Sequence, residues 1–147
     1  MDSFVTFGVS LGLASMLCCM PAGAAKLFSG PVEAVVVDVL DGDTFLAEAL
    51  VWPGHTVSIN VRIRGIDAPE MKASCDLEKH AALRARDALI SLFGNRPVAI
   101  SNVSGAKYYG RVLADVATAE GDMVAPILLN EKLVRPYDGG RRQPWCG

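Results

Sequence analysis

The chain has 147 residues, of which 51% are hydrophobic and 20% are charged, and this composition predicts one globular domain rather than two packed domains or a disordered chain. Four cysteines and two histidines are too few for a disulfide-dense miniprotein, a haem pocket or a His-rich zinc site. The formal net charge is -2, so no global positive field indicates a nucleic-acid partner. Any anion must therefore be bound by a local cluster of side chains.

The N-terminal segment has the outline of a secretory signal peptide. Residues 4–25 contain no charged side chain and pass from bulky apolar residues to small ones. The small-x-small site Ala22-Gly23-Ala24 predicts cleavage before Ala25. We therefore expect residues 1–24 to be removed and residues 25–147 to form the exported domain, periplasmic or secreted.

Two alternatives to cleavage remain open for this segment. Its n-region carries Asp2 and no basic residue, which is unusual for a signal peptide. An uncharged run of this length can also span a bilayer, so an uncleaved anchor would hold the domain at a membrane. A buried core helix is the third interpretation.

Five runs rich in β-branched and apolar residues, each bounded by turn formers, predict five strands. In chain order they are Glu33–Asp38, Asp43–Leu50, Thr56–Arg64, Pro97–Val103 and Gly110–Ala117. The turn Leu40-Asp41-Gly42 lies between the first two, so we expect a hairpin there. In the third run, alternation predicts an apolar face from Val57 to Ile63 and a polar face that ends in Arg62 and Arg64.

Two helices complete the predicted fold. Apolar residues at helical spacing predict an amphipathic helix over Asp76–Phe93, which Gly94 ends; they are Leu77, Ala81, Ala85, Ala88, Leu89 and Leu92. A second helix is expected from Asp122 or Met123 to about Leu133, with Pro126 in its first turn. This order predicts a mainly β, α+β domain, and a five-stranded Greek-key barrel plugged by a helix leaves few open edges.

Three local clusters contain side chains that could carry chemistry. The first is Asp41-Gly42-Asp43-Thr44, and the second is Arg62–Glu70, in which Asp67 and Glu70 flank a proline. The third is Lys107-Tyr108-Tyr109-Gly110-Arg111. Each also has a structural interpretation: Asp and Gly favour any turn, loop acids are often solvated, and Tyr and Arg often cap a strand edge.

Together the clusters supply the groups that phosphodiester hydrolysis needs. Oxygen ligands from Asp43, Asp67 and a backbone carbonyl suit Ca²⁺. Glu70 can accept a proton from an attacking water. Arg62 and Arg111 can grip a phosphate by bidentate hydrogen bonds and oppose the charge that builds on it.

Four segments, VLDGDTF, VRIRGIDAPE, YGRVLADV and LLNEKLVRPY, closely resemble the staphylococcal nuclease-like (thermonuclease) family in order and spacing. The resemblance extends from about Val32 to Tyr137. It implies an OB-fold five-stranded barrel with two helices. It also implies a Ca²⁺-dependent nuclease that acts on DNA and RNA and leaves 3′-phosphates.

The resemblance also assigns roles to residues. Asp43 and Asp67 match the metal carboxylates, and Ala68 stands where the family has a threonine that offers its backbone carbonyl. Glu70 matches the general base, which reaches the metal through water. Arg62 and Arg111 match the two catalytic arginines.

The substrate-binding residues match the family less completely. Tyr109 matches the tyrosine of the nucleotide pocket, whereas Tyr108 replaces a lysine and Lys107 stands one position earlier. Because the chain is slightly acidic, it should attract polynucleotide more weakly than the strongly basic family member.

The C-terminal tail from Arg135 to Cys146 replaces the family's last helix. Tyr137 and Trp145 are candidates to stack on a base, while Arg141 and Arg142 meet phosphates. The alternative is that the tail packs against the barrel and its arginines stay in solvent.

The cysteines indicate one disulfide. Cys18 and Cys19 lie in the predicted signal peptide, which leaves Cys75 and Cys146 as a pair in an exported chain. Two free thiols are the alternative. His55, at a hairpin tip, and His80, on a helix, are expected at the surface.

A function of another class is also consistent with the sequence, namely a non-catalytic OB-fold module that binds nucleic acid or a protein. The presence of both arginines and all three acids favours the enzyme. No protein partner is implied, and we expect a monomer.

Overall fold

The computed structural model describes residues 26–106 and 110–147, and within them the chain forms seven strands and two helices. In chain order these are β1 (Val32–Val39), β2 (Thr44–Trp52), β3 (His55–Ile63), β4 (Ile66–Asp67), α1 (Asp76–Phe93), β5 (Val98–Gly105), β6 (Arg111–Ala117), α2 (Val124–Asn130) and β7 (Arg135–Pro136). The predicted signal peptide lies outside the described residues.

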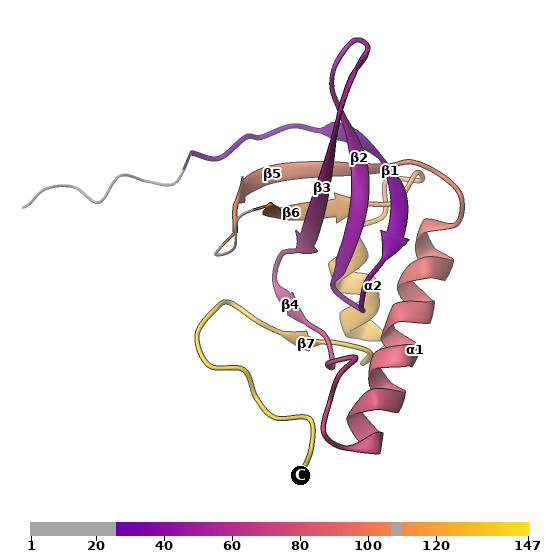
Figure 1. Ribbon diagram of the computed structural model, residues 1–147, viewed down its shortest axis with the longest axis vertical. Coiled ribbons are helices and arrows are strands. Elements are labelled where there is room, and N and C mark those ends of the chain that lie inside the picture. The colour runs from indigo at the N-terminus through magenta and orange to yellow at the C-terminus, as the bar shows by residue number, and fades with distance from the viewer. Residues whose placement is uncertain (1–25, 107–109) are drawn as a thin grey trace, which may run out of the picture.

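Five strands close into a barrel in the order β1-β2-β3-β6-β5 (Figure 1). All neighbours are antiparallel except β3 and β6, which run parallel. Closure removes the open edges that a flat five-stranded sheet would have. The predicted barrel with two helices is therefore confirmed, including the β1–β2 hairpin, which pairs from Ala34↔Ala49 to Val39↔Phe45.

The outer half of the β2–β3 hairpin extends beyond the barrel (Figure 1). Val61 and Ile63 are buried in the core, as the alternation in β3 predicts, but Val57 is exposed. Trp52, on the facing strand, is also exposed. The apolar face of β3 is therefore a core face only at its C-terminal end, where the rest of the barrel covers it.

Helix α1 has the predicted bounds, but the residues that it buries differ from the predicted stripe. Glu78 is buried and Leu77 is exposed, so the buried face is shifted by one residue in the first turn. Further along, Leu89 and Phe93 pack into the core, where the Phe93 and Phe45 rings meet edge to face at 4.9 Å. The helix is thus fixed to the barrel at its C-terminal end by aromatic packing.

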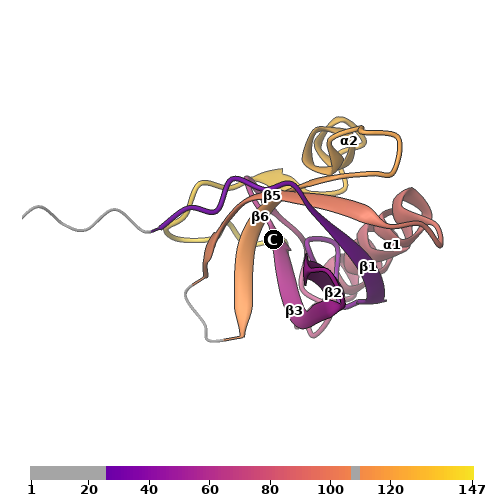
Figure 2. The same cartoon turned by 90° about the horizontal axis from the view of Figure 1, so that it is seen from above.

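Helix α2 lies on the same side of the barrel as α1 (Figure 2) and is shorter than predicted. Pro126 falls in its first turn, as expected. The helix ends at Asn130 rather than near Leu133, because Lys132 takes a left-handed conformation (φ 59°) and the N–H of Leu133 donates to the carbonyl of Leu128.

Two short strands, β4 and β7, were not predicted. They pair antiparallel, Ile66 with Pro136 and Asp67 with Arg135, next to the lower end of β3 (Figure 1). A two-residue strand gives no periodicity to read, and proline usually argues against a strand. This pairing brings the start of the C-terminal tail beside the loop that carries Asp67.

Gly42 allows the turn before β2 to pack directly on α1. A Cβ at this position would lie 2.6 Å from the Cβ of Ala85 and 3.0 Å from the Cβ of Ala68. Neither methyl group can rotate away, so the turn and the helix would have to separate.

We expect Gly42→Ala to lower the free energy of unfolding by about 1–3 kcal/mol through overpacking, measured by urea denaturation. Gly105→Ala is the matched control, because a Cβ there meets nothing within 4 Å. An equal effect of the two changes would contradict the close packing of this turn.

Candidate active site

Asp43 joins the turn before β2 to the loop after β3. The residue is buried. Its Oδ1 accepts a hydrogen bond from the hydroxyl of Thr44 at 2.8 Å, and its Oδ2 accepts one from the backbone N–H of Ala68 at 2.8 Å. Its own N–H donates to Asp41 Oδ1 at 2.9 Å. The carboxylate is therefore held in one orientation by both segments.

Burial raises the pKa of Asp43 to about 6, and the neighbouring charge of Asp41 adds to the effect, while Arg62 opposes it. A carboxylate binds a cation in its ionised form. The position thus favours a bound positive charge, since a cation would offset the cost of burying the anion.

Arg62 lies between the two buried acids. It stands on β3 opposite Thr44, with Nη1 3.3 Å from Asp43 Oδ2 and Nη2 3.5 Å from Asp67 Oδ1. Nη1 also donates to the carbonyl of Ile66 at 2.9 Å, and the guanidinium lies 5.7 Å from the centre of the Tyr137 ring. These contacts fix the orientation of the Arg62 guanidinium at the site.

Arg64, two residues later, has a structural role instead. Its Nε lies 3.2 Å from Asp115 Oδ1, and Nη2 donates to the carbonyls of Asn102 and Leu113. Arg64 thus ties β3 to the β5–β6 pair. The sequence places both arginines on one face, and only the structure separates their roles.

Three further predicted site residues, Glu70, Arg111 and Tyr137, line one cleft with Asp43 and Arg62, which extends from the turn before β2 to the C-terminal tail. Its lining side chains include Asp43, Arg62, Glu70, Arg111, Tyr137 and Arg142. Arg111 begins β6 and pairs in register with Asn60 of β3, which places it near Arg62. Lys107, Tyr108 and Tyr109 lie outside the described residues.

Arg142 contacts the acidic residues directly, a contact that the sequence analysis missed. Its Nε lies 2.6 Å from Asp67 Oδ1, Nη2 donates to the carbonyl of Ala68 at 3.0 Å, and Nη1 forms an ion pair with Glu70. Partial burial acts to lower the pKa of Arg142, but the hydrogen bonds to Asp67 and Glu70 outweigh it and raise the pKa. The guanidinium is permanently charged.

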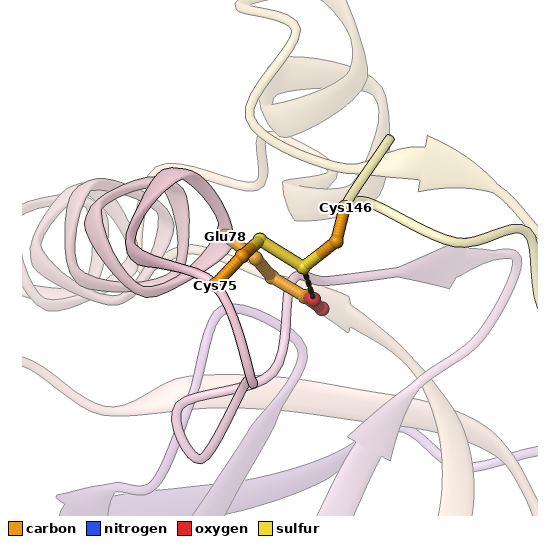
Figure 3. A group of neighbouring side chains, drawn as sticks. All are labelled: Cys75, Glu78 and Cys146. Carbon is orange, nitrogen blue, oxygen red and sulfur yellow. Dashed lines mark hydrogen bonds between the residues drawn. A yellow bond between two sulfur atoms is a disulfide. The ribbon is translucent and has the colours of Figure 1, made fainter.

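The tail packs back on the molecule, which agrees with the packed alternative, except that Arg142, although 41% exposed, forms ion pairs with Asp67 and Glu70. The predicted disulfide between Cys75 and Cys146 is present, with the two Cα atoms 6.0 Å apart (Figure 3). The guanidinium of Arg135 lies 3.8 Å from the centre of the Trp145 ring. The hydroxyl of Tyr137 donates to the carbonyl of Gly140 at 2.9 Å.

Glu78 connects the disulfide to the Glu70 loop. Its Oε1 accepts a hydrogen bond from the backbone N–H of Glu70 at 3.0 Å, and its Oε2 lies 3.2 Å from Cys146 Sγ (Figure 3). Among the described residues, Cys75, Glu78 and Cys146 form the one group of three ligand-type side chains within 4.8 Å of one another. Because the two sulfur atoms are bonded to each other, neither is a thiolate that would bind a metal.

The oxygen atoms near Ala68 are of the kind that a hard divalent cation binds. Asp43 and Asp67 are buried, the backbone N–H of Ala68 donates to Asp43, and the carbonyl of Ala68 accepts from Arg142; Ca²⁺ takes carboxylate, carbonyl and water oxygens. Asp67 Oδ1 and the carbonyl oxygen of Ala68 already contact a positive group, the guanidinium of Arg142. These residues would hold Ca²⁺, with Glu70 at the exposed side of the site.

The fold is a closed barrel, and Asp43, Glu70, Arg62 and Arg111 line one cleft on it. The family model for staphylococcal nuclease homologues matches residues 60–142, which is more than half of the chain. The chain therefore belongs to the staphylococcal nuclease homologue family. No curated protein matches it.

In the part of the chain that the structure describes, neither helix is long and apolar enough to span a bilayer.

Proposed function

We propose that the protein is a Ca²⁺-dependent nuclease that hydrolyses phosphodiester bonds of DNA and RNA. The observation that supports this function best is the position of Arg62. Its guanidinium contacts Asp43 and Asp67, the two acids assigned to the metal, and lines one cleft with Arg111 and Glu70. Residues far apart in the sequence thus offer cation ligands, phosphate donors and a base within one site.

Each side chain of the cleft has a role in this reaction. Glu70, whose side chain is 54% exposed, takes a proton from the water that attacks phosphorus; the bond from phosphorus to the 5′-oxygen breaks, and that oxygen takes up a proton from solvent to become the 5′-hydroxyl. Arg62 and Arg111 donate hydrogen bonds to the non-bridging oxygens, where negative charge increases in the transition state. Tyr137 lines the same cleft and offers an aromatic face to a nucleotide base.

A bound Ca²⁺ would polarise the phosphate and neutralise part of its charge. Asp43, Asp67 and the carbonyl of Ala68 would hold it, and Glu70 would reach it through water. The slightly acidic chain implies that substrate binding depends on this local site rather than on the overall charge.

Removing Ca²⁺ should abolish the activity. We expect excess EGTA to stop digestion of single-stranded DNA, and added Ca²⁺ to restore it. Release of acid-soluble nucleotides is the measurement. Undiminished cutting in EGTA would refute the metal role, and binding of DNA without cutting in Ca²⁺ would favour the non-catalytic binding module.

We also propose that the domain is exported, with a membrane anchor as the alternative. The disulfide supports this localisation, since such bonds persist in oxidising compartments outside the cytosol. N-terminal sequencing of the protein from the periplasm or medium should begin at Ala25. A chain that begins at Met1 in the membrane fraction would instead support the anchor.

A further inference from the structure

We propose that Arg142 is a tethered cation that competes with Ca²⁺ for the acidic site, so that the metal binds only when this segment of the tail moves away. The inference rests on the Ca²⁺ site proposed above and adds a means of regulating it. It concerns Arg142, which lies beyond the four resembling segments, at the last residue of the family match.

The guanidinium engages the same groups that would hold the metal. Its three nitrogen atoms contact Asp67 Oδ1, the carbonyl of Ala68 and the carboxylate of Glu70. Two of these are assigned as direct ligands and the third as the water-linked acid. A Ca²⁺ ion and a guanidinium cannot use the same oxygen lone pairs at once, and their charges repel.

The planar fork of arginine makes this contact specific. A guanidinium presents donors in a fixed geometry that matches several oxygens together, whereas an ammonium acts as a point charge. Asp67 is only 3% exposed, so its side of the ion pair is poorly screened by water. The Arg142 side chain is 41% exposed and that of Glu70 is 54% exposed, so water screens the pair with Glu70 more.

The tail is anchored on both sides of Arg142. On one side, the N–H of Tyr137 donates to the carbonyl of Gly65 at 3.0 Å, next to the β4–β7 pair. On the other side, Cys146 is bonded to Cys75. A loop held at both ends keeps its side chain at a high effective concentration near its target. The disulfide thus makes the arginine an intramolecular competitor.

Competition multiplies the association constant for Ca²⁺ by the fraction of molecules whose site is open. If Arg142 occupies the site nine times in ten, the metal binds about tenfold more weakly than to the open site. Removing the guanidinium should therefore tighten Ca²⁺ binding, even though the substitution takes contacts away from the site.

The test is isothermal titration of Ca²⁺ into the full chain, kept soluble in detergent micelles. We expect Arg142→Gln to bind Ca²⁺ at least about tenfold more tightly than the unmodified chain. Arg141→Gln is the matched control, because Arg141 is exposed and the change removes the same charge one residue away. It should alter the affinity less than twofold.

A second variant tests the tether. Cys75→Ser/Cys146→Ser should also tighten Ca²⁺ binding, while Arg142→Gln in that background should add little. If Arg142→Gln binds Ca²⁺ as the unmodified chain does, or more weakly, the competition is refuted and the Ca²⁺ site stands. If neither chain binds Ca²⁺, both the competition and the proposed metal dependence are refuted.

Discussion

Arg62→Lys is expected to lower kcat for single-stranded DNA by about 100- to 1000-fold, the loss typical when one preorganised donor to a transition-state anion is removed. Lysine keeps the positive charge between Asp43 and Asp67, so the fold should survive. One ammonium cannot replace the fork that now reaches Asp43, Asp67 and the carbonyl of Ile66. Because the interaction with phosphate is needed most in the transition state, nucleotide binding should weaken much less than kcat.

Arg64→Lys is the matched control for this prediction. Arg64 stands two residues away, directly after β3, and pairs with Asp115 rather than with the acids of the site. Its replacement should lower the stability and leave kcat nearly unchanged. Equal losses of kcat and nucleotide affinity in Arg62→Lys would show that Arg62 only positions the substrate, and a similar kcat in both variants would refute its proposed role.

Much of the barrel can be predicted from the sequence because its strands are long enough to show a pattern. Helix α1 was predicted with its observed bounds, since its apolar spacing is followed by Gly94, which takes a positive φ of 55°. The centre of the candidate site was predictable for a similar reason. Arg62, Asp67 and Ala68 lie within seven residues, and a strand end and a short loop already bring them together.

The parts that the sequence does not reveal depend on contacts between distant segments. Glu78 occupies a position that the helical pattern gives to solvent, yet it is buried and accepts a hydrogen bond from the backbone N–H of Glu70. Arg142 reaches Asp67 because the β4–β7 pair and the disulfide bring the tail across the molecule. No local pattern distinguishes it from Arg141. The Cys75 and Cys146 pair is the one sequence feature that indicates where the tail ends.

Glu70→Gln is expected to lower kcat by about 100- to 10,000-fold, the range that general-base catalysis contributes. The amide keeps the size of the side chain and cannot accept the proton of the attacking water. The backbone contact to Glu78 uses the N–H of residue 70, so the loop should keep its position. Steady-state kinetics on single-stranded DNA in saturating Ca²⁺ is the measurement.

Two further measurements separate the loss of a base from loss of the metal. Glu48→Gln, a change at an exposed acid on β2, controls for the change in charge and should leave kcat unaltered. Glu70→Gln also removes the ion pair with Arg142, so competition at the site should weaken and the Ca²⁺ affinity should not fall steeply. If Ca²⁺ affinity falls as much as kcat, Glu70 acts chiefly as a metal ligand. If kcat is retained in saturating Ca²⁺, another group accepts the proton and the assignment of the base is wrong.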